Sequence, residues 1–165
     1  MILDLKRIFA TDNSVLEINH SLDMSDVDFY GNYPLKNPIK ITGFVSNKAS
    51  VVSLKLTIEY VFAAPCDRCG IFAQHNHTVN VDKMLATAIE RQESDTIITV
   101  PDMKLDVDEF VYSEVILDLP SKHLCKDDCK GICFKCGKNL NEGECDCETR
   151  EVDPRLAKLM ELLDN

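Results

Sequence analysis

The middle of the chain alternates apolar and polar side chains with the period of a β-strand. From residue 50 to 62, the sequence SVVSLKLTIEYVF places large apolar side chains on one face and mostly polar ones on the other. The apolar face consists of Val52, Leu54, Leu56, Ile58, Tyr60 and Phe62. Because successive side chains of a strand point to opposite faces, the segment predicts a long strand with one buried face.

Shorter segments predict the rest of an antiparallel sheet. The stretch PIKITGFVS from residue 38 alternates in the same way, and the polar NKAS after it favours a turn, so the two segments predict a hairpin. The pattern around residues 84–93 fits helix and strand equally well. Further strands are predicted at residues 2–9, 14–19, 71–82 and 96–100.

The period changes to that of a helix at Asp106. Val107, Phe110, Val111 and Val115 are spaced to share one helical face. Asp106 and Glu109 match the capping box that starts many helices, and Pro120 ends the pattern.

A second amphipathic helix is predicted near the end of the chain. Asp153 suits the N-cap and Pro154 the first helical position, where a missing N–H costs nothing. Its apolar stripe is expected to dock on the protein's own sheet, the alternative being a groove of a partner. The stripe consists of Leu156, Leu159, Met160 and Leu163.

These elements together predict an α+β fold in two parts. Residues 1–120 form a mainly antiparallel β-sheet body that ends in a helix. Residues 121–165 form a cysteine-rich, zinc-ribbon-like module, whose C-terminal helix packs back on the body.

Composition narrows the class of protein. The 165 residues carry a formal net charge of -10, which argues against a protein that coats nucleic acid with its whole surface. No run approaches the ~20 apolar residues of a membrane span. The N-terminal sequence MILDLKRIFATDNS lacks the features of an export signal, so we expect a cytoplasmic protein without a membrane partner.

The reducing cytosol favours metal or redox roles over disulfides for the eight cysteines. Cys133, Cys136, Cys145 and Cys147 form the pattern C-x-x-C-G, eight residues, C-x-C, which is typical of a structural zinc site. Gly137 suits the end of a tight turn that brings the first pair to one side of the metal. The segment has too few apolar residues to fold unaided, so one zinc ion is expected here.

The other four cysteines, Cys66, Cys69, Cys125 and Cys129, allow a second four-sulfur zinc site. Such a site would clamp distant parts of the chain together. The spacing leaves two alternatives open: Cys129 and Cys133 could exchange partners, or Cys66 and Cys69 could bind zinc with His75 and His77. Surface positions are the commoner use of such histidines, and His123 is expected to be an ordinary residue as well.

Lysines surround the late cysteines. Lys126, Lys130, Lys135 and Lys138, together with Arg68, are candidate contacts for RNA or an acidic partner. They also fit a solvated surface, or a balance for the charge of metal thiolates.

Motifs of catalysis are missing from the sequence: it has no phosphate-binding glycine loop, nucleophile elbow or open metal site, so we expect no enzyme and no small-molecule substrate. The alternative is a thiol redox or metal-handling protein that uses the C-D-R-C pair Cys66 and Cys69, with Arg68 favouring a thiolate. A redox pair of that type normally opens a helix, however, and this one follows a strand.

Three stretches of the sequence are distinctive together: CDRCG after a long strand, LCKDDCKGICFKCGKNLNEGECDC, and the closing VDPRLAKLMELL. With these stretches, the sequence resembles the bacterial YceD family of large ribosomal RNA subunit accumulation proteins. It implies a non-enzymatic accessory role in large ribosomal subunit biogenesis, in the accumulation or processing of ribosomal RNA. The implied partner is a ribosomal protein, precursor ribosomal RNA or a nuclease.

Overall fold

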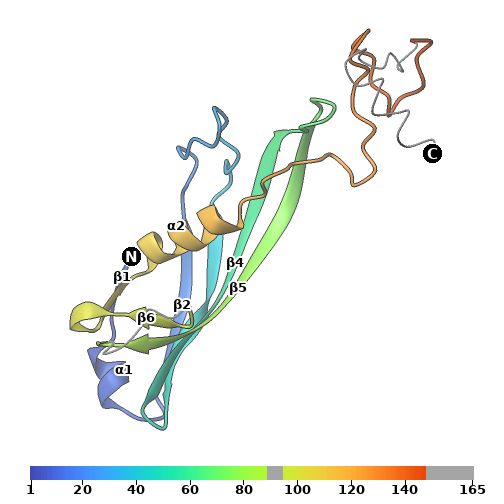
Figure 1. The fold of residues 1–165 in the computed structure, drawn as a ribbon. Coiled ribbons are helices and arrows are strands. Elements are labelled where there is room, and N and C mark those ends of the chain that lie inside the picture. Colours follow the sequence, from blue (N-terminus) through green and yellow to red (C-terminus); the bar gives the residue numbers. More distant parts are fainter. Residues whose placement is uncertain (89–94, 148–165) are drawn as a thin grey trace, which may run out of the picture.

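Five strands form a curled sheet in the order β2, β3, β4, β5, β6 (Figure 1). The computed structural model describes residues 1–88 and 95–147. All neighbouring strands are antiparallel except β5 and β6, which are parallel. The predicted fold class, a mainly antiparallel sheet with few helices, is therefore confirmed. The strands are β2 (Val15–Leu22), β3 (Ile39–Lys48), β4 (Val51–Pro65), β5 (Phe72–Ala86) and β6 (Ile97–Thr99).

The alternating segment of the sequence is the centre of the sheet. β4 pairs with β3 from Lys48 opposite Val51 to Lys40 opposite Glu59, which confirms the predicted hairpin. On its other side, β4 pairs with β5 along its length, to Pro65 opposite Phe72. The six apolar side chains predicted to share one face are all buried, with at most 3% of their surface exposed.

The first residues differ from the prediction. A strand was expected over residues 2–9, but β1 (Ile2–Asp4) ends early and the helix α1 (Lys6–Ala10) follows. Leu5 and Ile8 are buried and Phe9 packs against the core, so the apolar residues follow the i, i+3, i+4 spacing of a short helix. β1 pairs with β7 (Lys104–Asp106) in a separate two-stranded sheet.

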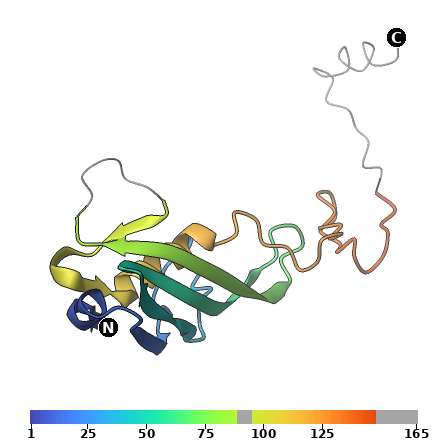
Figure 2. The same ribbon diagram turned by 90° about the horizontal axis from the view of Figure 1, so that it is seen from below.

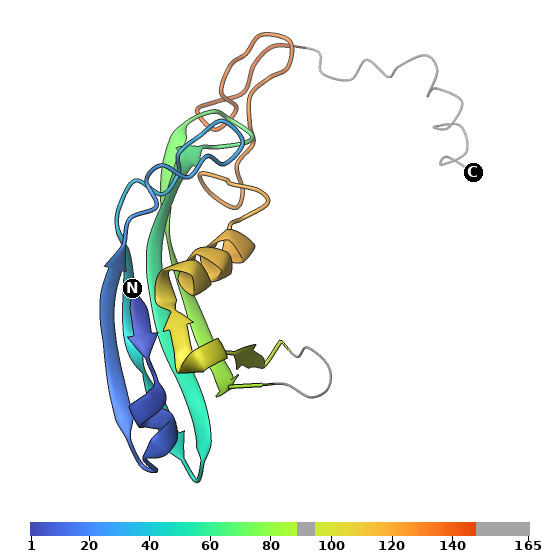
Figure 3. The ribbon, with the colours of Figure 1, turned by 90° about the vertical axis from the view of Figure 1, so that its left-hand side faces the viewer.

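The main helix, α2 (Val107–Asp118), lies across the concave side of the curled sheet (Figure 3). A short 3-10 helix, η1 (Pro101–Met103), precedes β7 and leads towards α2. α2 buries Val107, Val111 and Val115 completely, as the spacing predicted, whereas Phe110, predicted on the same face, is only partly buried against the core. These contacts join the helix to the main apolar core, so they fix the place where the chain leaves the body after Leu119.

At the start of α2, the predicted N-cap role of Asp106 is confirmed. Asp106 Oδ1 accepts hydrogen bonds from the backbone N of Asp108 at 3.0 Å and of Glu109 at 3.4 Å. Replacing Asp106 with alanine leaves these donors unpaired and should lower the free energy of unfolding by about 1 kcal/mol. Urea denaturation measures the change. Asp102→Asn, in the preceding turn, is the control: it removes a carboxylate but tolerates the φ of 54° at that position, so it should change stability much less. Equal effects of the two variants would contradict the capping role.

Residues 121–147 extend beyond the ends of β4 and β5 (Figures 1 and 2). This segment, called the cysteine module here, has no named helix or strand, only a bridge between Ile132 and Asn139. The helix predicted after Pro154 and its docking on the body lie outside the described residues, as does part of the ambiguous segment 84–93. In the described part of the chain, no helix is long and apolar enough to cross a membrane.

Candidate metal centres

The structure gathers the eight cysteines into two groups of four. Within each group, the four sulfur atoms lie within 4.8 Å of one another. This grouping is one of those that the spacing of the cysteines allowed: Cys129 joins Cys66 and Cys69, whereas Cys133 belongs to the other group. Centre A consists of Cys66, Cys69, Cys125 and Cys129, and centre B of Cys133, Cys136, Cys145 and Cys147.

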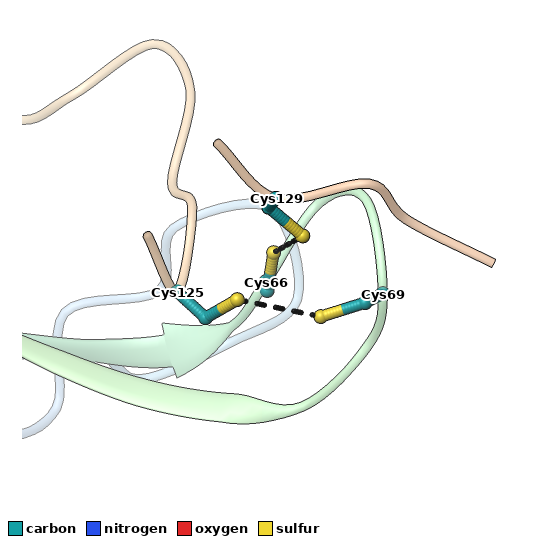
Figure 4. Close-up of side chains that lie close together, drawn as sticks. All are labelled: Cys66, Cys69, Cys125 and Cys129. Carbon is teal, nitrogen blue, oxygen red and sulfur yellow. Dashed lines mark hydrogen bonds between the residues drawn. The ribbon is translucent and has the colours of Figure 1, made fainter. Parts of the chain in front are cut away.

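Centre A joins the end of β4 to the cysteine module (Figure 4). Its Sγ atoms are 3.8 Å apart for Cys66 and Cys129 and 3.5 Å apart for Cys69 and Cys125. A tetrahedron with metal–sulfur bonds of about 2.3 Å has edges of about 3.8 Å. All eight cysteines are free, and these separations far exceed the ~2.05 Å of a disulfide bond. Both groups could therefore bind a metal ion.

The first pair of each centre is presented by the same turn. In centre A, Cys66 N donates to Ile71 O and Gly70 N donates to Cys66 O, both at 2.8 Å. The turn of centre B repeats both bonds at the same spacing, from Cys133 N to Lys138 O and from Gly137 N to Cys133 O. Gly70 and Gly137 close the turns with φ of 72° and 74°, a left-handed conformation that glycine adopts without strain. The predicted role of Gly137 is confirmed.

The two residues between Cys66 and Cys69 hold the cysteine module in place. Asp67 Oδ2 accepts from His123 N at 2.6 Å, and Asp67 N donates to His123 O at 2.9 Å. Arg68 Nη1 donates to Cys129 O at 2.7 Å. Arg68, predicted as a partner contact or an aid to a thiolate, thus positions the backbone of a centre A cysteine.

The two histidines of the alternative zinc site do not belong to centre A. His75 Nε2 lies 2.8 Å from Leu124 O, and His77 stacks on Tyr60 with ring centroids 5.0 Å apart. Neither histidine lies in a group of potential metal ligands among the described residues. The structure therefore favours the site of four cysteines over the alternative site of Cys66, Cys69, His75 and His77. His123 is buried, packs 5.0 Å from the Phe62 ring and has its Nε2 3.2 Å from a backbone oxygen.

Sequence reasoning missed the structural roles of Asp67 and His123. Asp67 carries no signal beyond its place inside C-D-R-C, between two cysteines that converge. His123 is two residues before Cys125, but its burial depends on Phe62, which is 61 positions away in the sequence. The contact between His123 and Phe62 forms against the paired ends of β4 and β5, so it can be recognised only once that pairing is known.

Within each centre, the surroundings lower the pKa of some cysteine thiols and raise the pKa of others. Burial disfavours the Cys66 thiolate, but N–H groups of Cys125 and Arg68 donate to its sulfur and the pKa falls to about 6. Backbone N–H groups of residues 136 and 135 likewise lower the pKa of Cys133 to about 6. Burial and the neighbouring thiols raise the pKa of Cys125 to about 12. Each centre therefore contains a ready thiolate beside thiols that stay protonated at neutral pH.

Metal binding to centre A should therefore release protons in a pH-dependent number. Near pH 7.5, Cys66, whose pKa is lowered to about 6, binds as a thiolate, whereas Cys69 and Cys125, whose pKa values are raised, must lose protons. We expect at least two and fewer than four protons per metal at that pH, rising towards four well below pH 6. Apparent affinity must fall as pH falls, because more protons compete. Calorimetry of the Cys147→Ser variant in buffers of different ionisation enthalpy measures the number; a constant value from pH 5.5 to 8 would contradict it.

The two centres differ in exposure. Cys66, Cys69 and Cys129 are buried in centre A, whereas Cys136 of centre B is exposed. Of the predicted lysine contacts, Lys126 and Lys130 are next to centre A cysteines in the sequence, and Lys135 and Lys138 lie in the loop of centre B. Lys126 and Lys138 have local partners. Lys126 Nζ is 3.6 Å from Asp128 Oδ1, and Lys138 Nζ donates to Glu144 O at 2.6 Å. That pattern fits charge balance within the module.

Comparisons with known proteins agree with the resemblance. A family model described as "Large ribosomal RNA subunit accumulation protein YceD" matches residues 54–163. The chain is 24% identical over 152 residues to the "Large ribosomal RNA subunit accumulation protein YCED homolog 1, chloroplastic" of Arabidopsis thaliana, covering 74% of this chain and 47% of the relative. A homologue of the same description from Zea mays is 22% identical over 182 residues, covering 91% and 62%.

A bacterial relative shares a shorter region. An uncharacterized protein of Mycobacterium bovis is 36% identical over 74 residues, covering 45% of this chain and 35% of that protein. The chain thus spans about half the length of the Arabidopsis relative and about a third of the mycobacterial one. No solved structure matches the chain.

Proposed function

Because the chain belongs to the YceD family of large ribosomal RNA subunit accumulation proteins, we propose that it is a non-enzymatic accessory factor in large ribosomal subunit biogenesis. The observation that carries the proposal is the extent of the family match, residues 54–163. The matched region includes β4 from Leu54 onward, β5, α2 and all eight cysteines. We place the protein in the cytoplasm.

Two structural zinc ions complete the proposal. Four thiolates at tetrahedral spacing are the usual ligand set of structural zinc, and they leave no coordination position for water or substrate. Centre A would join the β4–β5 end to the cysteine module, and centre B would close the outer loop. Metal analysis tests the identity of the ion, since the same ligands also suit iron, which would colour the protein.

Charge favours a protein as the direct partner. The chain is acidic overall, and residues 12–35 carry five carboxylates and no lysine or arginine. An acidic surface repels ribosomal RNA and attracts basic proteins. A ribosomal protein or a nuclease is therefore the preferred partner, and precursor ribosomal RNA would be reached through it or through a narrow contact at the lysines of the module.

The test combines depletion with sedimentation. Depleting the protein should lower large-subunit ribosomal RNA, and the tagged full-length chain should migrate with immature large subunits. Crosslinking in cells then identifies whether the contact is protein or RNA. Asn76→Ala, an exposed substitution on β5, should restore function, whereas Cys125→Ser, which removes a centre A ligand, should not. Normal ribosomal RNA after complete depletion would overturn the proposal.

Redox chemistry at Cys66 and Cys69 is the second candidate. The lowered pKa of Cys66, about 6, favours a reactive thiolate. Both sulfurs are buried, however, and the pair lies in a turn between antiparallel strands instead of at the start of a helix. A Cys66–Cys69 disulfide that forms and is reduced readily in the metal-loaded protein would favour the redox function over the structural one.

A further inference from the structure

One asparagine side chain connects the loop of centre B to a cysteine of centre A. Asn141 lies between Cys136 and Cys145 in the sequence, and its Nδ2 donates to Cys129 Sγ at 3.4 Å. Its Oδ1 accepts from the backbone N of Lys130 at 2.9 Å. Both ends of this amide therefore hold the segment that carries Cys129, although Asn141 belongs to the loop that centre B closes.

The Asn141 amide is held in one orientation. Asn139 Oδ1 accepts from Asn141 N at 3.0 Å and from Asn141 Nδ2 at 2.8 Å. Asn139 Nδ2 in turn donates to Glu142 Oε1 at 3.0 Å. Because the turn is preorganised, the N–H that reaches Cys129 costs little entropy to position.

The position of that turn depends on centre B. Residues 138–140 return beside residues 131–133 through bonds from Cys133 N to Lys138 O and from Leu140 N to Gly131 O, at 2.8 and 2.9 Å. Few apolar contacts support this return: Ile132 is 50% exposed and Phe134 is 76% exposed. A metal held by the four sulfurs of centre B is therefore the main cross-link that keeps Asn141 against Cys129.

We propose that Asn141 couples the two metal centres, so that metal in centre B strengthens the retention of metal in centre A. The inference rests on the proposed metal binding. Residues that hydrogen-bond a metal ligand typically change metal affinity 10- to 100-fold when they are removed. Since coupling between two binding sites is reciprocal, metal in centre A strengthens centre B by the same factor.

Exposure sets the order of release. Cys136 is exposed, whereas three of the four centre A cysteines are buried. Centre B therefore exchanges its metal first. Its loss frees Asn141, and centre A then holds its own metal less tightly.

The test follows metal release from the full-length protein loaded with Co²⁺, whose absorption with thiolates reports bound metal, after addition of excess EDTA. The wild-type protein should lose its two ions in a fast and a slow phase. Centre B empties while centre A is still loaded, so the coupling acts on the fast phase: Asn141→Ala should bind two ions but speed the fast phase about tenfold or more. Asn141→Asp, which keeps the acceptor for Lys130 N and removes the donor to Cys129, should do the same. The matched control Asn76→Ala should leave both phases unchanged.

A second route removes centre A itself. Cys125→Ser should leave one bound ion, in centre B, released at the faster rate seen in Asn141→Ala, and adding Asn141→Ala to it should change that rate no further. A fast phase that keeps its wild-type rate in Cys125→Ser, or in a folded Asn141 variant, overturns the coupling. If the wild-type chain binds two ions and releases them independently, only the coupling fails. If it binds none, the proposed metal binding fails as well.

Discussion

Removing both metal ions is expected to detach the cysteine module from the sheet while the body stays folded. The main apolar core ends at Leu119, and His123, packed on Phe62, is the module's contact with it. Among the described residues, Leu124 is the one apolar side chain besides the cysteines that packs at centre A. Metal binding contributes on the order of 10–16 kcal/mol in small modules of this kind, far more than the hydrogen bonds of Asp67 and Arg68 can replace.

Nuclear magnetic resonance of the full-length protein measures the effect residue by residue. After EDTA treatment under reducing conditions, amide signals of residues 121–147 should move to random-coil positions, and those of β3 and β4 should remain. Zinc should restore the spectrum. Cys125→Ser tests centre A separately, and the exposed substitution Asn76→Ala is the control. A module that keeps its dispersed signals after complete metal removal would contradict the prediction and the structural role of the metal.

The predictions from sequence succeed where the physical cause is local. The alternation in β4 reflects a strand with one buried face, and six consecutive inward positions are enough to show it. The start of α2 depends on a side chain that reaches only two and three residues ahead. The turn that presents Cys133 likewise involves only residues 133–138, which include Gly137.

Contacts between distant segments could not be predicted in this way. β1 pairs with β7 across about a hundred residues, and nothing in the sequence of either strand selects the other. The helix α1 appears where a strand was expected because Leu5 and Ile8 find a core that only the assembled sheet creates. In both cases tertiary packing decides over the local pattern.

The cysteines show the same limit within one site. Spacing allowed Cys129 and Cys133 to exchange partners, because both precede a short turn. Their separation in the structure follows from contacts made by residues between and beyond the cysteines: Arg68 holds the backbone of Cys129, and Asn141 holds its sulfur. The sequence was enough to identify the cysteines as candidate metal ligands. Which four cysteines share one centre depends on how the body folds.

Replacing Gly43 with valine is expected to destabilise the sheet strongly. Gly43 of β3 lies opposite Leu56 of β4 on one side and Ile18 of β2 on the other. A Cβ at this position would lie 2.0 Å from Lys55 O and 2.9 Å from the Leu56 Cα. Both are backbone atoms, so the strands themselves must separate, and the free energy of unfolding should fall by about 3 kcal/mol or more.

Urea denaturation of the metal-loaded protein measures this loss. Thr42→Val adds a β-branched apolar side chain at the neighbouring position of β3, where no such contact with backbone arises, and should change stability by no more than about 0.5 kcal/mol. The effect of Gly43→Val should also be independent of metal, because the site lies in the body and both centres lie beyond its strand ends. A Gly43→Val protein as stable as the wild type would show that β3 and β4 are not paired in the register that places Gly43 opposite Leu56. The whole buried face of β4 depends on that register, because a shift of one residue would turn its apolar side chains to solvent.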